Sequence, residues 1–390
     1  MPTNSNFKYI PSLKNWFEEN ISDCRRLDKG NIKHALANIL IIAFCAIMGG
    51  CTSFEMIRAF AESFEEDFTR LLNLTHGLPS KDTFRRAFAQ INPQELRATF
   101  NAWAQVEDLP IRIIAFDGKT IRCSKHQDMK AAHIVTFFSP EQLVSIDEIQ
   151  VQEKSNEISA VNEMLDRMAR NGKIEGLAFT ADAMSCQRNI CSKITDNGGS
   201  FVFSLKENQK TLYQDVKLYF DGDSSYESIE IALGNKHGRP GMVIYSYTTD
   251  IDFLQYHNWP GLKGIGCVTT ITKKDGKNVV STLYYIGSVD NVAEFYTIRS
   301  KYWSIENNLH WNLDECYHED RSRTRTQNGA QNINIFRKTV LFFIEKGKIL
   351  QTQLKKLSKM TIIFKCGQSL TFIESILNSY FIQLKELSCK

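Results

Sequence analysis

The stretch RIIAFDGKTIRC, residues 112–123, changes character in its middle. The apolar run Ile113–Phe116 is typical of a buried strand, and Asp117, Gly118 and Lys119 follow it directly. A core strand that ends on a carboxylate holds that group rigidly at the edge of a sheet. Gly118 permits close approach of a ligand, and the Lys119 ammonium can meet a phosphate. We therefore expect this strand to end at Asp117, as a functional carboxylate.

A second stretch, LAFTADAM at residues 177–184, repeats the pattern and ends its apolar run at Asp182. If the two strands are neighbours, Asp117 and Asp182 meet at one edge of the sheet. Two charges about 4 Å apart repel by about 4 kcal/mol at an effective dielectric near 20, so such a pair requires a proton or a cation between them. The alternative is that each aspartate only caps the turn or helix that follows it.

A third acidic group lies in YWSIENNLHWNLDE, residues 302–315, which reads as a helix. Glu306, His310 and Asp314 are spaced four residues apart and so share one helix face. A single histidine on a helix is usually structural, and Asp314 could pair with an arginine. Glu306 lies on a partly apolar stripe, where an acid needs a partner.

Asp117, Asp182 and Glu306 together offer hard oxygen ligands, which suit Mg²⁺ or Mn²⁺ and not zinc. Two such ions about 3.5–4 Å apart can activate a water or hydroxyl and stabilise the leaving oxygen of an in-line phosphoryl displacement. The sequence therefore predicts a metal-dependent site that acts on phosphate esters.

The composition gives little sign of a polyanion-binding protein as a whole, because 47 basic residues balance 44 acidic ones in 390 residues. Binding to nucleic acid would have to use patches. One candidate patch lies between Asp320 and Lys359; the alternative is a solvated helix face. Its basic residues are Arg321, Arg323, Arg325, Arg337, Lys338, Lys346, Lys348, Lys355, Lys356 and Lys359.

The ten cysteines are scattered, and most lie in apolar or helical contexts without any CxxC pair. With no signal peptide ahead of the first domain, this indicates a reduced cytoplasmic protein and excludes a disulfide scaffold or zinc module. The apolar run 35–50 is shorter than the roughly 20 residues of a spanning helix, so we expect a buried helix and no membrane partner.

The pattern along the chain predicts an α/β fold with a mixed sheet. Residues 12–105 read as helical, with Ser80 as a helix cap, residues 111–206 alternate strands and helices, 227–290 are β-rich and 291–357 are helical again. The predicted domains are 1–108 (helical, with possible DNA binding), 109–220 (first part of the catalytic core), 221–290 (β-rich insertion), 291–345 (helical end of the core) and 346–390 (basic tail).

Taken together and in order, several motifs resemble a DDE transposase of bacterial insertion sequences, in the branch that includes the Rhs-associated H-repeat proteins. The resemblance covers roughly residues 20–345. It is carried by DKGNIKHALANILIIAFCAIMGGCTSFEMI, GLPSKDTFRRAF, IAFDGKTIR, KSNEISAVNEML, ADAMSCQ, LKENQKTL, HGR and YWSIENNLHWNLDECYHEDRSRTR.

The resemblance implies an RNase H-like catalytic core in which Asp117, Asp182 and Glu306 form the metal-binding triad for two Mg²⁺ or Mn²⁺ ions. The 124 residues from Asp182 to Glu306 leave room for the β-rich insertion that related transposases carry before their catalytic glutamate. The implied reaction is nicking at the element's terminal inverted repeats, then attack of the freed 3′-hydroxyl on target DNA. A homodimer in the active complex and a cytoplasmic, nucleoid-associated location follow from that role.

The residues expected to contact DNA come from these motifs and from the basic patch. They are Lys119, Lys206, Asn208, Gln209, Arg239, His310, Arg321, Arg323, Lys355 and Lys356.

Three features depart from the family pattern. Gly241 stands where the His-Gly-Arg motif usually leads to a glutamate, and the divergent tail is not typical of the family. Tyr302 and Leu313 replace an arginine and a lysine found in hairpin-forming relatives, so no hairpin chemistry is inferred. Two other functions remain open: a catalytically inactive remnant that only binds DNA, and a metal-dependent nuclease without strand transfer.

Overall fold

The strand that contains Asp117 is longer than the sequence predicted. In the computed structural model β1 spans Ile113–Thr120 and continues past Asp117, because residues 117–120 pair antiparallel with the next strand. The structure describes residues 7–25, 32–125, 130–151, 156–222, 225–233, 241–274, 277–346 and 370–388.

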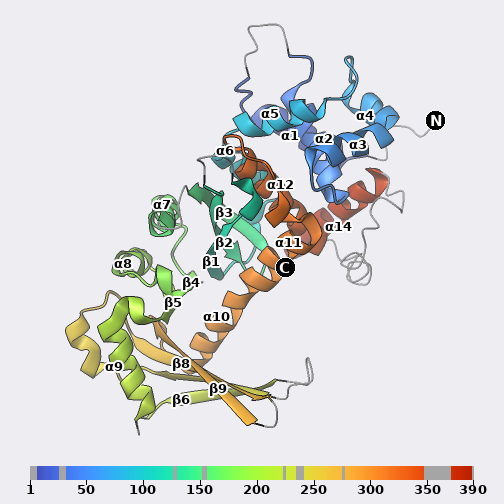
Figure 1. The fold of residues 1–390 in the computed structure, drawn as a ribbon. Coiled ribbons are helices and arrows are strands. Elements are labelled where there is room, and N and C mark those ends of the chain that lie inside the picture. The colour runs from blue at the N-terminus through green and yellow to red at the C-terminus, as the bar shows by residue number, and fades with distance from the viewer. Residues whose placement is uncertain are drawn as a thin grey trace.

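The centre of the fold is a mixed sheet with helices on both faces (Figure 1). Its first five strands lie in the order β3-β2-β1-β4-β5, with β1, β4 and β5 parallel and β2 and β3 antiparallel. This confirms the α/β, RNase H-like mixed sheet. Besides β1, these strands are β2 (His133–Ser139), β3 (Val144–Val151), β4 (Ala178–Ala181) and β5 (Ser200–Leu205).

The β-rich stretch extends the same sheet. Strand β9 pairs antiparallel with β5, and β8, β7 and β6 follow, which gives one sheet of nine strands among the described residues. The four strands are β6 (Glu227–Leu233), β7 (Gly241–Thr248), β8 (Gly264–Lys274) and β9 (Lys277–Gly287).

Helices pack on each face of the sheet through apolar stripes. On one face, Val161 and Leu165 of α7 and Ile190 of α8 share a buried cluster with Ile114 and Phe116 of β1. On the other face, α10 packs against β1, β4 and β5. The helices are α7 (Glu157–Arg170), α8 (Arg188–Asp196), α9 (Lys210–Asp221) and α10 (Val292–Ser304).

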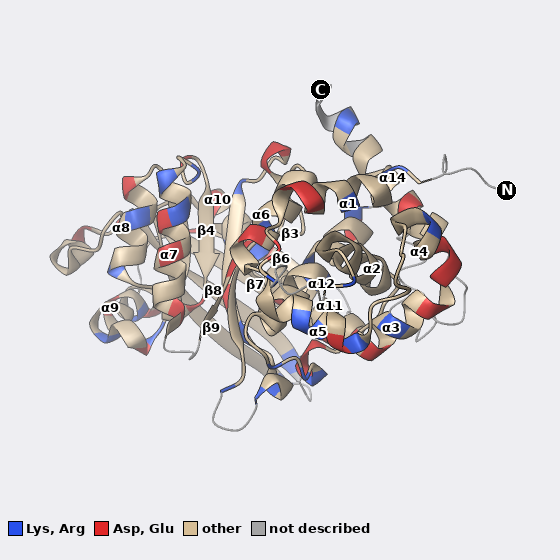
Figure 2. Ribbon diagram, turned by 90° about the horizontal axis from the view of Figure 1, so that it is seen from above, with Lys and Arg blue, Asp and Glu red and all other residues tan. Residues whose placement is uncertain are grey.

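The predicted helical region forms one end of the molecule, around a central apolar helix (Figure 2). Every residue of α2, Leu36–Met48, is buried. None of the helices in the described part of the chain is long and apolar enough to cross a bilayer. Ser80 caps α5 as predicted, by accepting a hydrogen bond from the Thr83 amide at 3.2 Å. The helices are α1 (Tyr9–Asn20), α2, α3 (Phe54–Ser63), α4 (Glu65–Leu72), α5 (Lys81–Gln90) and α6 (Pro93–Trp103).

Two elements from the C-terminal part complete this helical end. Helix α12, Gly329–Lys346, packs against α2, α5 and α6 and against β3. Helix α14, Leu370–Ser388, belongs to the divergent tail and packs against α12, α1 and α2. Glu374 of α14 accepts hydrogen bonds from backbone amides at the start of α1, including that of Ile10 at 3.0 Å. The described part of the tail is thus built into the helical core.

The basic residues between Asp320 and Lys359 do not form one surface. Two of them belong neither to a nucleic-acid-binding patch nor to a solvated helix face, because they are buried. Arg337 and Lys338 lie on α12 with relative exposures of 1% and 4%. The Lys338 ammonium donates to Thr136 at 2.6 Å and to Glu148 at 3.0 Å, and Arg97 donates to the same Glu148 oxygen at 2.8 Å. These charges join helices to the sheet in the interior, where a count of basic residues along the chain cannot place them.

The cysteines predicted to lie in the core are buried with free thiols. Burial raises the pKa of Cys51 and of Cys191 to about 12, so both thiols stay protonated at neutral pH. The buried set is Cys45, Cys51, Cys186, Cys191 and Cys267.

Candidate active site

The sheet brings the two predicted aspartates to adjacent positions. The parallel pairing of β1 with β4 ends at Phe116 opposite Ala181, and Asp117 and Asp182 come next on the two strands. Phe116 and Ala181 both pack into the cluster under α7 and α8. Because side chains alternate along a strand, the two aspartates belong to the opposite face, which carries α10.

Asp182 is held by the turn that follows it. Its Oδ1 accepts hydrogen bonds from the amides of Met184 at 3.0 Å and Ser185 at 3.4 Å, so the capping interpretation is correct for this one oxygen. Asn208 donates to the Ala183 carbonyl at 2.7 Å, and Gln209 donates to the Cys186 carbonyl at 3.0 Å. Two predicted DNA contacts thus brace the loop that orients Asp182.

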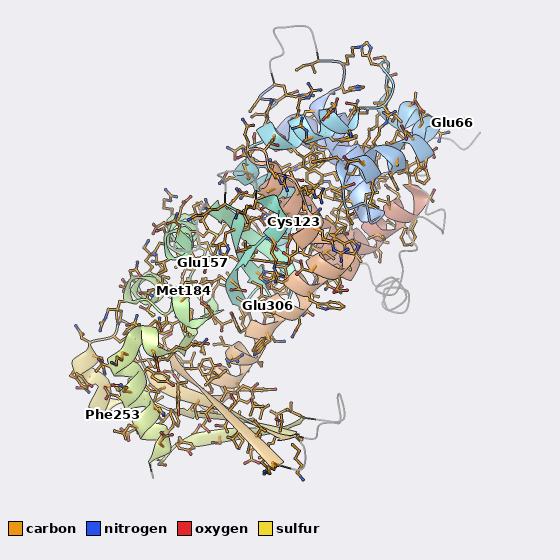
Figure 3. The ribbon with its side chains drawn as sticks, in the orientation of Figure 1. Glu66, Cys123, Glu157, Met184, Phe253 and Glu306 are labelled. Carbon is orange, nitrogen blue, oxygen red and sulfur yellow. The ribbon has the colours of Figure 1, made fainter. Side chains whose placement is uncertain are left out.

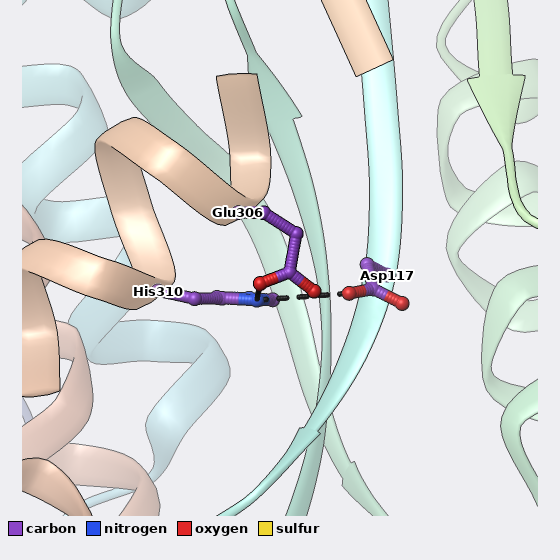
Figure 4. Close-up of side chains that lie close together, drawn as sticks. All are labelled: Asp117, Glu306 and His310. Atoms are coloured by element: carbon purple, nitrogen blue, oxygen red, sulfur yellow. Dashed lines mark ion pairs between the residues drawn. The ribbon is translucent and has the colours of Figure 1, made fainter. Parts of the chain in front are cut away.

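Glu306 lies in a π-helical segment, Ile305–His310, between α10 and α11 (Trp311–Tyr317). From this segment both Glu306 and His310 point toward Asp117 (Figure 4). The His310 Nδ1 lies 3.6 Å from Asp117 Oδ2 and 3.7 Å from Glu306 Oε2. One ligand atom from each of the three residues lies within 4.8 Å of the others. Single π turns inside α-helices are frequent at functional sites.

The carboxylates around Asp117 influence one another's protonation. Burial, then Glu306 and Asp182, raise the pKa of Asp117 well above its ordinary value. Burial also raises the pKa of Asp182, whereas the nearby His310 lowers the pKa of Glu306. The pKa of Tyr302 is raised by burial and then by Asp117, Asp182 and Glu306. All three carboxylates therefore act on one tyrosine hydroxyl, which the sequence had marked only as a departure from the family pattern.

Known protein families match nearly the whole chain. A family model described as "Transposase DDE domain" matches residues 108–343, and one described as "DDE_Tnp_1-associated" matches residues 17–104. The chain belongs to the DDE transposase family. The resemblance found in the sequence motifs is thereby confirmed.

Two relatives of this transposase come from Escherichia coli. "Putative transposase YncI" of strain O157:H7 is 33% identical over 92% of this chain and 93% of its own length. "H repeat-associated putative transposase YhhI" of strain K12 is 30% identical over 83% of this chain and 89% of its own. A solved structure, the piggyBac transposase synaptic complex with hairpin DNA, aligns with 97% of this chain and 80% of that chain at 11% identity and a TM-score of 0.41.

The Lys119 ammonium of this family member is turned toward acidic residues of the helical segment that follows His310, and is not exposed over Asp117 and Glu306. Its ammonium forms ion pairs at 2.8 Å with Asp314 and with Glu319, and donates to the His310 carbonyl at 3.2 Å. The side chain is 15% exposed. Lys119 therefore fixes the segment that carries Glu306 and His310 against β1, and its contact with a phosphate stays a prediction.

The other predicted DNA contacts divide into exposed and undescribed residues. Lys206 is exposed at the end of β5 and favours the charged form of Asp182. Arg321 and Arg323 are exposed in the segment between α11 and α12. Arg239, Lys355 and Lys356 lie outside the described residues.

A fourth carboxylate, Glu157, lies near the site, and the sequence did not identify it as a candidate functional residue. Glu157, at the start of α7, pairs with His133 of β2, and His133 Nδ1 lies 2.7 Å from the Thr120 hydroxyl. A Cβ on Gly118 would come within 2.5 Å of His133 and 2.7 Å of Glu157, so this glycine is needed for close packing. Figure 3 labels Glu157 near the middle of the molecule, as it does Glu306. The motif KSNEISAVNEML contained Glu157, but only the fold shows its partner.

The residues at this point fit a divalent cation. Asp117 and Glu306 converge with His310, and Asp182 adjoins Asp117 on the next strand. Burial, together with Glu306 and Asp182, raises the pKa of Asp117, and a bound cation would favour its charged form.

In metal-free protein, we expect Asp117→Asn to increase the free energy of unfolding at pH 8 by on the order of 2 kcal/mol. A raised carboxyl pKa means that the folded state binds more protons than the unfolded state above the ordinary pKa, so wild type loses stability as pH rises. The gain should vanish near pH 4, where the carboxyl is protonated in the folded state. Urea denaturation in EDTA at both pH values measures it.

The exposed Asp166, paired with Lys193, provides the control substitution Asp166→Asn. Equal stability of Asp117→Asn and wild type at pH 8 would show that Asp117 carries no electrostatic penalty.

Proposed function

We propose that this protein cleaves the ends of an insertion sequence and joins the freed 3′-hydroxyl to target DNA. The observation that supports the proposal is the adjacency of Asp117 and Asp182 on two parallel strands, with Glu306 of the π-helical segment converging on Asp117, in a chain of the DDE transposase family. Two Mg²⁺ or Mn²⁺ ions held by these carboxylates would activate the attacking water or hydroxyl and stabilise the leaving oxygen.

The protein's own residues supply the positioning. β1 and β4 hold Asp117 and Asp182 side by side, and the backbone amides of Met184 and Ser185 orient Asp182. Lys119 fixes the backbone at His310. A site built on strands and backbone hydrogen bonds keeps its carboxylates in place while DNA is exchanged.

The DNA partners we propose are the terminal inverted repeats and the target duplex. Exposed Lys206 lies beside Asp182, and exposed Arg321 and Arg323 follow α11, so both groups can contact phosphates near the carboxylates. Joining two ends needs two active sites, so we propose a homodimer in the active complex. Action on DNA fits the cytoplasm and association with the nucleoid.

Two other functions share part of this site. An inactive DNA-binding remnant would not need Asp117, Glu306 and His310 to converge beside Asp182, and it is disfavoured by this arrangement and by the packing of α14 from the divergent tail. A metal-dependent nuclease would need the same carboxylates and differs only in the attacking group.

The test is incubation of the full chain with a labelled duplex that carries the element's own end, and with a scrambled duplex, in Mg²⁺, in Mn²⁺ and in EDTA. We expect incision at the element end with either metal, none in EDTA, and joining of the cut end to a plasmid. Binding without incision under every condition would favour the remnant. Incision of both duplexes without joining would favour the nuclease.

A further inference from the structure

His310 is the one nitrogen donor among the three side chains that converge at Asp117. Its ring is 5% exposed, and its Nδ1 faces both carboxylates (Figure 4). The distances of 3.6 Å to Asp117 and 3.7 Å to Glu306 are longer than a hydrogen bond. The nitrogen is therefore aimed into the carboxylate site without being hydrogen-bonded there.

These distances suit ligands of one ion. Atoms that each lie about 2.1 Å from a metal can be up to about 4.2 Å apart. Both separations of His310 Nδ1 fall within that limit. A bare imidazole–carboxylate ion pair would instead close to about 2.8 Å.

The fold holds the ring in this place. Lys119 donates to the His310 carbonyl, and the neighbouring Leu309 and Leu313 are buried. His310 also lines a small cavity of mixed polar and apolar lining, whose polar groups include Lys119, Lys338 and Glu319. Ligating histidines are typically supported by polar groups behind the ring, which fix the ring orientation.

We propose that His310 Nδ1 is a ligand of the divalent ion that Asp117 and Glu306 hold, and that this mixed nitrogen–oxygen site selects Mn²⁺ over Mg²⁺. Mg²⁺ strongly prefers oxygen ligands, whereas imidazole raises the affinity for transition-metal ions. The proposal rests on the proposed function, because that function supplies the metal. It replaces the earlier assignment of His310 as a DNA contact.

The probe is Mn²⁺ alone, added to the full chain and followed by electron paramagnetic resonance. Free Mn²⁺ is counted to obtain the affinity, and electron spin-echo modulation reports a directly bonded ¹⁴N. We expect ¹⁴N modulation in wild type, and its replacement by ¹⁵N modulation in protein labelled with ¹⁵N-histidine. The labelled wild type keeps the test valid even if a variant fails to fold.

The variant is His310→Asn, whose amide oxygen replaces Nδ1 with a hard donor. We expect it to lose the ¹⁴N modulation and to bind Mn²⁺ at least about tenfold more weakly, with a smaller change for Mg²⁺ measured by competition. The control is His257→Asn, which changes a half-buried histidine that pairs with Asp215 and is not part of the carboxylate site. The control should behave as wild type.

Two failures are distinguishable. Mn²⁺ that binds in an Asp117-dependent way without ¹⁴N modulation, or with modulation that survives His310→Asn, overturns the role of His310 and leaves the proposed function standing. Mn²⁺ binding that Asp117→Asn leaves unchanged overturns the metal site itself, and the proposed function with it.

Discussion

Glu306→Gln is expected to slow metal-dependent strand cleavage by about 1,000-fold or more, which corresponds to about 4 kcal/mol of lost transition-state stabilisation. The substitution keeps the size of the side chain but removes the charge that faces Asp117 and His310. Because the Glu306 side chain is 46% exposed, the fold should be unaffected. Single-turnover cleavage of a labelled element end measures the rate, and a gel-shift assay should show that DNA binding is retained.

Glu315 provides a matched control for this effect. It lies on α11 of the same helical segment and is exposed, so Glu315→Gln removes one carboxylate without touching the site. We expect its cleavage rate to stay within about twofold of wild type. A Glu306→Gln protein that retained a tenth of the wild-type rate would exclude Glu306 from the catalytic machinery.

Glu148→Ala is expected to destabilise the protein by about 3–5 kcal/mol. Glu148 is 2% exposed and accepts hydrogen bonds from Arg97 of α6 and Lys338 of α12. Its removal leaves two buried cations without their counter-charge. Urea denaturation at neutral pH measures the change in the free energy of unfolding.

Two further variants test the cause of that loss. Glu163→Ala removes an exposed partner of Arg167 and should cost no more than about 1 kcal/mol. Adding Lys338→Met to Glu148→Ala should restore part of the stability, since one unpaired cation is then gone. If the double variant is less stable than Glu148→Ala, then Lys338 stabilises the fold through packing and not through charge.

Much of the fold follows from local pattern. Apolar runs located the strands and their alternation with helices predicted a mixed sheet, but the order of the strands is known only from the structure. The adjacency of Asp117 and Asp182 was predicted on the condition that their strands are neighbours, and the parallel pairing of β1 with β4 meets that condition. The extension of β1 beyond Asp117 could not be predicted in the same way, because it depends on pairing with β2.

The site was predicted less completely, for physical reasons. A regular α-helix was assumed for residues 302–315, whereas a π turn occupies Ile305–His310 and Asp314 pairs with Lys119. Likewise, Arg337 and Lys338 read as surface charges because Glu148, the partner of Lys338, lies far away in the sequence. Both errors concern side chains whose surroundings are set by tertiary packing.

The pairing of β9 with β5 joins the strands of the insertion and the strands that carry the carboxylates in one continuous sheet. The outermost strand β6 lies six strand spacings from β1, which is roughly 29 Å at about 4.8 Å per spacing. An unbroken series of backbone hydrogen-bonded strands links this outer edge to Asp117. The strands of the insertion and the carboxylates are therefore parts of one rigid layer and are not free to move independently.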